Sequence, residues 1–113
     1  MRILCHYIYE YRKGVRNLIL CTLAARLEED AINKLEKYGI RYMIQRLPNG
    51  NVNIFFGDEE CLDVTCRMCR GRKLNELSPE EDFMLGILLG YSVKEQCRRY
   101  CKKTRNKNHI QLN

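Results

Sequence analysis

The chain has 113 residues, of which 45% are hydrophobic and 30% charged, which is typical of one globular domain and unlike a disordered or membrane-spanning chain. Its 20 Lys and Arg residues outnumber its 14 Asp and Glu residues, and the net charge of +6 favours acidic partners such as nucleic acid, anionic lipid or an acidic protein. The longest apolar stretch, residues 83–91, is too short for a membrane span, and the N-terminus lacks the extended apolar segment of a secretory signal. We therefore expect a cytoplasmic protein in which the seven cysteines are free thiols.

The N-terminal part of the chain predicts a helix, a strand and a second helix. Residues 3–12 fit both a helical stripe and a strand-like alternation of tyrosines, and the helix is favoured because Lys13-Gly14 resembles a helix end. Residues 17–23 form a short apolar run that predicts a strand covered on both faces. Apolar residues recur at helical spacing over 26–38, and Gly39 is suited to end that helix in the left-handed conformation.

Asn49-Gly50 predicts a β-hairpin, because this dipeptide tolerates the positive φ angles of a two-residue turn between strands 40–47 and 52–57. Such a turn pairs Leu47 with Val52, Gln45 with Ile54 and Met43 with Phe56, and places Tyr42, Ile44 and Phe55 on the opposite face. Both faces of the sheet are then partly apolar. Because the few helices of one chain have two such faces to cover, we expect a symmetric partner and hence a homodimer.

Three further helices are predicted in the C-terminal half. Residues 58–70 are amphipathic and are followed by Gly71. The capping pattern that begins at Ser78 starts a helix running through residue 89, and Ser92 starts a last helix that ends near Lys103. Residues 104–113 have no apolar periodicity and are expected to form a basic, mobile tail. The sequence thus predicts one α+β domain over residues 1–103, with a small three-stranded sheet that contains one β-hairpin and packs with about five helices.

Two cysteine pairs are candidates for a metal site. Cys66 and Cys69 form a C-x2-C pattern and Cys97 and Cys101 a C-x3-C pattern, which together could supply four thiolates to zinc. Cys61 extends the first pair to C-x4-C-x2-C, close to the spacing of plant-type iron–sulfur proteins. Both pairs lie on predicted apolar helix faces, where cysteine often serves as a small core residue, so packing is favoured. We expect no cofactor, and keep zinc binding or a redox role of the thiols as the alternative.

The sequence contains no recognisable catalytic apparatus. It has no glycine-rich phosphate loop, no H-E-x-x-H motif and no nucleophile elbow, and its two histidines, His6 and His109, lie at opposite ends of the chain. The acidic groups at 58–60 and 80–82 fall at predicted helix starts, where carboxylates stabilise the helix dipole. Nothing in the sequence therefore indicates an enzyme, and no residue is assigned as catalytic.

The clearest surface feature is a basic cluster on the last predicted helix and its extension, formed by Arg98, Arg99, Lys102, Lys103, Arg105 and Lys107. We expect this cluster to contact an acidic protein partner. Nucleic acid is the alternative partner, disfavoured because Tyr100 is the only aromatic residue within the cluster and lies on its apolar side.

Three segments together resemble a family of small bacterial proteins catalogued as a domain of unknown function. These segments are HYIYEYRKGVRNLIL at 6–20, NVNIFFGDEEC at 51–61 and SPEEDFMLGILLGY at 78–91. The resemblance covers nearly the whole chain and implies three strands, about five helices and a homodimer. Members of that family are often encoded beside a flavodoxin, an acidic electron carrier, so the resemblance also implies a flavodoxin as partner. It supplies no catalytic residues and no motif that matches the cysteine pairs.

Overall fold

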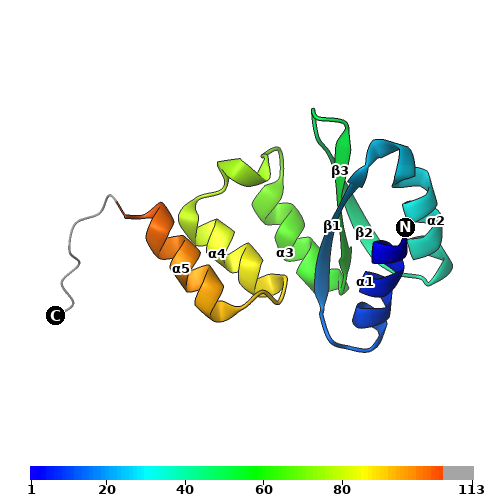
Figure 1. Cartoon of the computed structure of the whole chain (residues 1–113), viewed down its shortest axis with the longest axis horizontal. Coiled ribbons are helices and arrows are strands. Elements are labelled where there is room, and N and C mark those ends of the chain that lie inside the picture. Colours follow the sequence, from blue (N-terminus) through cyan, green and yellow to red (C-terminus); the bar gives the residue numbers. More distant parts are fainter. Residues whose placement is uncertain (106–113) are drawn as a thin grey trace.

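The computed structural model describes residues 1–105 and packs five α-helices with a three-stranded antiparallel sheet, which confirms the predicted α+β class (Figure 1). In chain order the elements are α1 (Arg2–Arg12), β1 (Leu18–Ala24), the 3-10 turn η1 (Ala25–Leu27), α2 (Glu28–Lys37), β2 (Arg41–Arg46), β3 (Asn51–Gly57), α3 (Glu59–Cys69), the 3-10 turn η2 (Leu74–Glu76), α4 (Pro79–Leu88) and α5 (Val93–Lys103). The strand order is β1-β3-β2. The molecule is elongated, 53 Å by 32 Å by 24 Å, with α1 and α2 at one end and α5 at the other (Figure 1).

Both faces of the sheet are covered by helices of the same chain, because neighbouring strand residues point to opposite faces. Ile19 and Phe56 face α1 and α2 and belong to one apolar core, whereas Leu18 and Phe55 face α3 and α4 and belong to a second core. The helices contribute Leu4, Ile8, Ala31 and Leu35 to the first core, and Leu62, Met68, Cys69, Leu77, Leu85 and Leu89 complete the second. Within residues 1–105 each sheet face has helices packed on it, so the uncovered face from which a homodimer was expected is not found there, and the homodimer itself stays a prediction.

The β2–β3 hairpin is confirmed, but its predicted register is wrong by one residue. Arg46 pairs with Val52 and Met43 pairs with Phe55, because the loop holds three residues, Pro48, Asn49 and Gly50. Only Gly50 of these has a positive φ, +85°. Proline is suited to the first central position of a type I turn, and a residue in the left-handed region completes the three-residue hairpin loop. The shift exchanges the two faces of β2, so that Tyr42 and Ile44 enter the core beneath α1 and α2.

Local signals at the helix starts are confirmed by the hydrogen bonds. Ser78 caps α4, since its Oγ accepts from the Glu81 backbone N–H at 3.1 Å while a Glu81 carboxylate oxygen accepts from the Ser78 N–H at 2.9 Å. Ser92 caps α5 by accepting from the Glu95 N–H at 3.3 Å. The ambiguous N-terminal segment is a helix, α1, as favoured.

The outermost helix, α5, packs chiefly on α4. Its Gln96 is 9% exposed and lies over Gly86, where a Cβ atom would overlap the Gln96 side chain. α5 can therefore approach α4 closely because position 86 has no side chain. None of the helices within residues 1–105 is long and apolar enough to cross a bilayer. Most of the predicted tail, residues 106–113, lies outside the described part of the chain, and Lys107 and His109 lie there too.

Candidate functional site

The predicted basic cluster lies on α5, but two of its cations already have carboxylate partners. Arg99 donates two hydrogen bonds to Asp82 of α4, at 2.7 Å and 3.0 Å, and these bonds raise the pKa of Arg99. Arg98 pairs with Glu95, one turn earlier, at 3.1 Å. Lys102, Lys103 and Arg105 are exposed and form no ion pair within residues 1–105. The free positive charge of this surface is therefore concentrated at the C-terminal end of α5.

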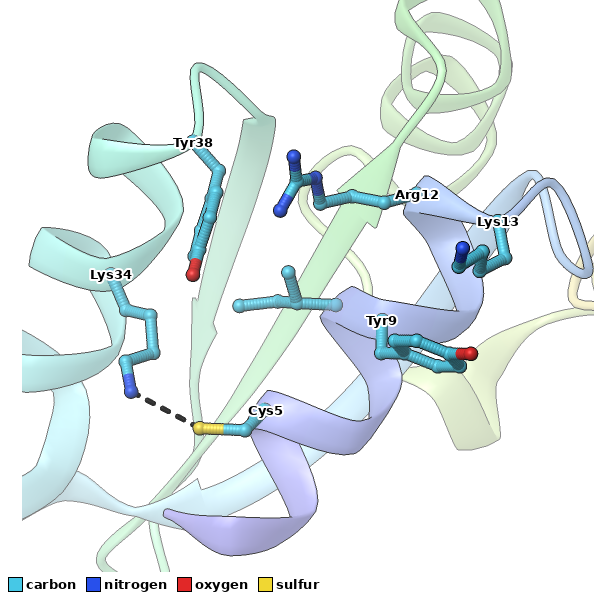
Figure 2. A pocket seen from close by; sticks show the side chains of 7 residues that line it. Cys5, Tyr9, Arg12, Lys13, Lys34 and Tyr38 are labelled. Carbon is cyan, nitrogen blue, oxygen red and sulfur yellow. Dashed lines mark hydrogen bonds between the residues drawn. The ribbon is translucent and has the colours of Figure 1, made fainter.

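A second basic surface lies at the opposite end of the molecule, in a groove between α1 and α2 with a volume of about 460 Å³ (Figure 2). Its lining comprises Cys5, Ile8, Tyr9, Arg12 and Lys13 from the α1 region and Lys34 and Tyr38 from the α2 region. Ile8 is 3% exposed and is the buried apolar residue of this lining. No Asp or Glu is among these lining residues, so the groove has a positive potential.

The cations of the groove are held by weak partners rather than by carboxylates. Lys34 donates from Nζ to the Cys5 Sγ at 3.1 Å, and this hydrogen bond raises the pKa of Lys34. The Arg12 guanidinium lies 4.6 Å from the centre of the Tyr38 ring, a cation–π contact. Within residues 1–105, Arg12, Lys13 and Lys34 have no carboxylate oxygen within 4.0 Å. Arg12 and Lys34 also lie in the last turns of their helices, where cations stabilise the helix dipole.

Sequence reasoning missed this groove. It treated Lys13 only as part of a helix end and singled out neither Arg12 nor Lys34. A usable signal was present, because Tyr9 and Arg12 lie three residues apart on one helix and Lys34 and Tyr38 lie four apart on the next. These two pairs indicate one basic groove only once α1 and α2 pack side by side on the same sheet face.

The two cysteine pairs lie in different hollows of the structure. Cys66 and Cys69, on α3, line a hollow beside the β2–β3 hairpin, whereas Cys97 and Cys101, on α5, line a hollow against α4. All seven cysteines lie within residues 1–105 and are free thiols. In this part of the chain, the structure has no group of three or more His, Cys, Asp or Glu side chains that could hold a metal ion. Cys69 is buried, and burial raises the pKa of its thiol.

The hollow beside Cys97 and Cys101 is almost wholly apolar. Phe83 and Met84 of α4 and Tyr100 of α5 line it together with Glu80 and the two cysteines, over a volume of about 470 Å³. The rings of Phe83 and Tyr100 meet edge to face with centres 6.0 Å apart. Met84 is 49% exposed, so the α4–α5 pair presents an apolar surface to solvent.

The acidic groups lie at helix starts, as predicted, and three of their carboxylates pair with arginines: Glu59 with Arg41, Glu81 with Arg72 and Asp82 with Arg99. Glu59 and Glu60 lie in the first turn of α3, and Glu80, Glu81 and Asp82 in the first turn of α4. Glu81 accepts from Arg72 at 2.9 Å, and this bond, aided by the Ser78 N–H, lowers the pKa of Glu81 to about 2. His6 lies 3.7 Å from Glu10, one turn later on α1.

Comparison with known proteins gives a family and no curated relative. No curated protein matches the chain. The family model described as "Protein of unknown function (DUF2023)" matches residues 2–103, from the first residue of α1 to the last residue of α5. The expected resemblance to a small domain of unknown function is thereby confirmed, and this chain belongs to the DUF2023 family.

Proposed function

We propose that this protein is a homodimeric binding module that engages an acidic protein partner through the basic end of α5. A flavodoxin is the candidate partner, because the family resemblance implies it and because its acidity complements the net charge of +6. The observation that carries the proposal is the exposure of Lys102, Lys103 and Arg105 at and just beyond the end of the outermost helix of an elongated molecule. None of the three forms an ion pair within residues 1–105.

The position of α5 suits contact with a large partner. The helix packs chiefly on α4 and lies at one end of the elongated molecule (Figure 1). Lys102 and Arg105 are exposed there, and Lys103 is exposed beside a hollow that it lines together with Arg99. Arg98 and Arg99 contribute less than predicted, because Glu95 and Asp82 offset their charges. Exposed cations of this kind increase the rate of association with an acidic partner more than they increase affinity.

A direct test reverses the two lysines and leaves the paired arginines intact, since reversing Arg99 would place a carboxylate beside Asp82. We expect Lys102→Glu/Lys103→Glu to abolish binding to a purified flavodoxin in surface plasmon resonance, and binding by the native protein to weaken as salt rises. The matched control, Arg26→Glu/Arg70→Glu, changes net charge equally at exposed positions elsewhere and is expected to retain binding. Equal loss in both variants, or no binding by the native protein, contradicts the proposal.

Nucleic acid is the alternative partner, and the same preparation distinguishes it. A gel shift with random DNA and RNA that weakens steeply with salt, together with no response to the flavodoxin, would assign the α5 cations to phosphate contacts.

The dimer part of the proposal is supported by the apolar surface of α4 and α5. The exposed hydrophobic residues of these two helices are Met84, Ile87 and Val93, and Met84 lines the apolar hollow together with Phe83 and Cys97. Large exposed apolar patches mark interaction sites in soluble domains. This surface is distinct from the basic residues at the end of α5, so one helix can serve both contacts.

Light scattering tests the dimer. We expect a mass of about twice 13.5 kDa for the native protein, and the mass of one chain for Met84→Glu. The matched control is Val64→Glu, because Val64 is similarly exposed but lies on α3, outside this surface. A native protein of single-chain mass, or a dimer that Met84→Glu leaves unchanged, contradicts the assignment.

A further inference from the structure

We propose that the groove between α1 and α2 is a second binding site, and that it takes a small aromatic phosphate monoester. Its phosphate would lie between Arg12 and Lys34, and its ring would lie beside the side chains of Tyr9 and Tyr38 (Figure 2). This inference goes beyond the proposed function, because the groove lies at the opposite end of the molecule from α5 (Figure 1).

The charges of the groove match a dianion. Arg12, Lys13 and Lys34 supply three cations, and no carboxylate lines the groove to offset them. A phosphate monoester carries a charge of about −1.5 to −2 at pH 7, so it would neutralise most of this positive charge. Arginine presents a planar set of donors that fits two phosphate oxygens, and lysine adds a compact charge.

A bound phosphate could displace the Cys5 thiol from Lys34 and could bind Arg12 without displacing Tyr38. Lys34 donates to the Cys5 thiol, which is a weak acceptor, so exchange for a phosphate oxygen gives a stronger hydrogen bond. Arg12 is stacked on Tyr38, which restricts the guanidinium before any ligand arrives and lowers the entropy lost on binding.

The shape and lining favour a small aromatic molecule over a protein surface. A volume of about 460 Å³ is in the range of small-ligand sites. Tyr9 is 59% exposed and Tyr38 is 43% exposed, so a ligand can reach the exposed part of each residue. Cations also lie over both rings, Lys13 at 5.6 Å from the centre of Tyr9, and Arg12 at 4.6 Å and Lys37 at 5.8 Å from the centre of Tyr38. Ile8 adds a buried apolar side chain to the lining. Stacking of a ligand ring on tyrosine adds affinity without demanding one particular ring.

The test uses phenyl phosphate as the probe, in calorimetric titrations and in nuclear magnetic resonance titrations of the ¹⁵N-labelled full chain. We expect saturable one-to-one binding, with amide shifts centred on Ile8, Arg12 and Tyr38. Lys34→Gln and Arg12→Gln should each weaken binding by about tenfold or more, the loss of one charge-assisted hydrogen bond. Lys94→Gln is the matched control, because Lys94 carries the same charge at an exposed position on α5, away from the groove, and it should change affinity by less than about twofold.

Three companion ligands define the chemistry. Benzoate keeps the ring and has a single charge, and methyl phosphate keeps the dianion without the ring, so both should bind more weakly than phenyl phosphate. Phosphatidylcholine vesicles containing phosphatidic acid test a lipid source of the same phosphate group, and we expect no groove-dependent binding to them.

Several outcomes would overturn the assignment: no saturable binding of phenyl phosphate, amide shifts outside the groove, or an equal loss in Lys94→Gln and Lys34→Gln. Vesicle binding that requires Lys34 would overturn the small-molecule assignment. Thermal unfolding of each variant separates loss of the site from loss of the fold. The Lys102→Glu/Lys103→Glu variant should bind phenyl phosphate normally, so failure here is distinguishable from failure of the α5 proposal.

Discussion

Replacing Gly57 by alanine tests how closely β3 packs against the chain segment that enters β1. Gly57 has a φ of +145°, and an added Cβ would overlap the Asn17 carbonyl oxygen and lie 3.0 Å from the Leu18 Cα. The same carbonyl accepts from the Asp58 N–H at 2.9 Å, so the backbone cannot move away without losing that hydrogen bond. Strain at such a φ costs about 1–3 kcal/mol and the lost hydrogen bond about 1 kcal/mol.

We therefore expect Gly57→Ala to lower the free energy of unfolding by about 2–4 kcal/mol, which corresponds to a decrease in Tm of about 10–25 °C. Urea unfolding followed by circular dichroism measures the loss. Gly50→Ala is the matched control, because Gly50 has a φ of +85° with nothing within 4 Å of the added Cβ. That control isolates the conformational cost, about 1–2 kcal/mol. The reasoning fails if the two variants lose the same stability.

Three other predictions concern a pKa, a core residue and the thiols. The pKa of Glu81 is about 2 in the folded protein, below the usual 4.5. The stability that its ion pair with Arg72 adds to the fold is therefore complete above pH 4.5 and is lost as the pH falls toward 2. The difference in urea midpoint between the native protein and Glu81→Gln should shrink over that range, and a constant difference would contradict this. Phe55→Ala should lower the free energy of unfolding by about 3–5 kcal/mol, because Phe55 is fully buried, and a urea-measured loss below about 1 kcal/mol would refute its place in the core. Iodoacetamide should modify exposed Cys97 much faster than buried Cys69, as read by peptide mass spectrometry, and equal rates would contradict the burial.

Helix starts and turns that depend only on residues close in the sequence were predictable from the sequence. The starts of α4 and α5 follow from Ser78 and Ser92, because a capping side chain reaches backbone groups only two or three residues away. The hairpin was also predictable from Asn49-Gly50, but its register was not, because Pro48 extended the loop to three residues. A single residue in a loop thus decided which face of β2 enters which core.

The candidate binding surfaces depended on contacts that no local pattern contains. The sequence by itself determined the net charge, the positions of the cations and the helices that carry them. Only the tertiary structure decided that Arg99 meets Asp82, 17 residues earlier, whereas Arg12 meets the ring of Tyr38, 26 residues later. The physical reason is that the field of a charge depends on which groups pack within a few ångströms of it, and packing of α5 on α4 and of α1 beside α2 sets those neighbours.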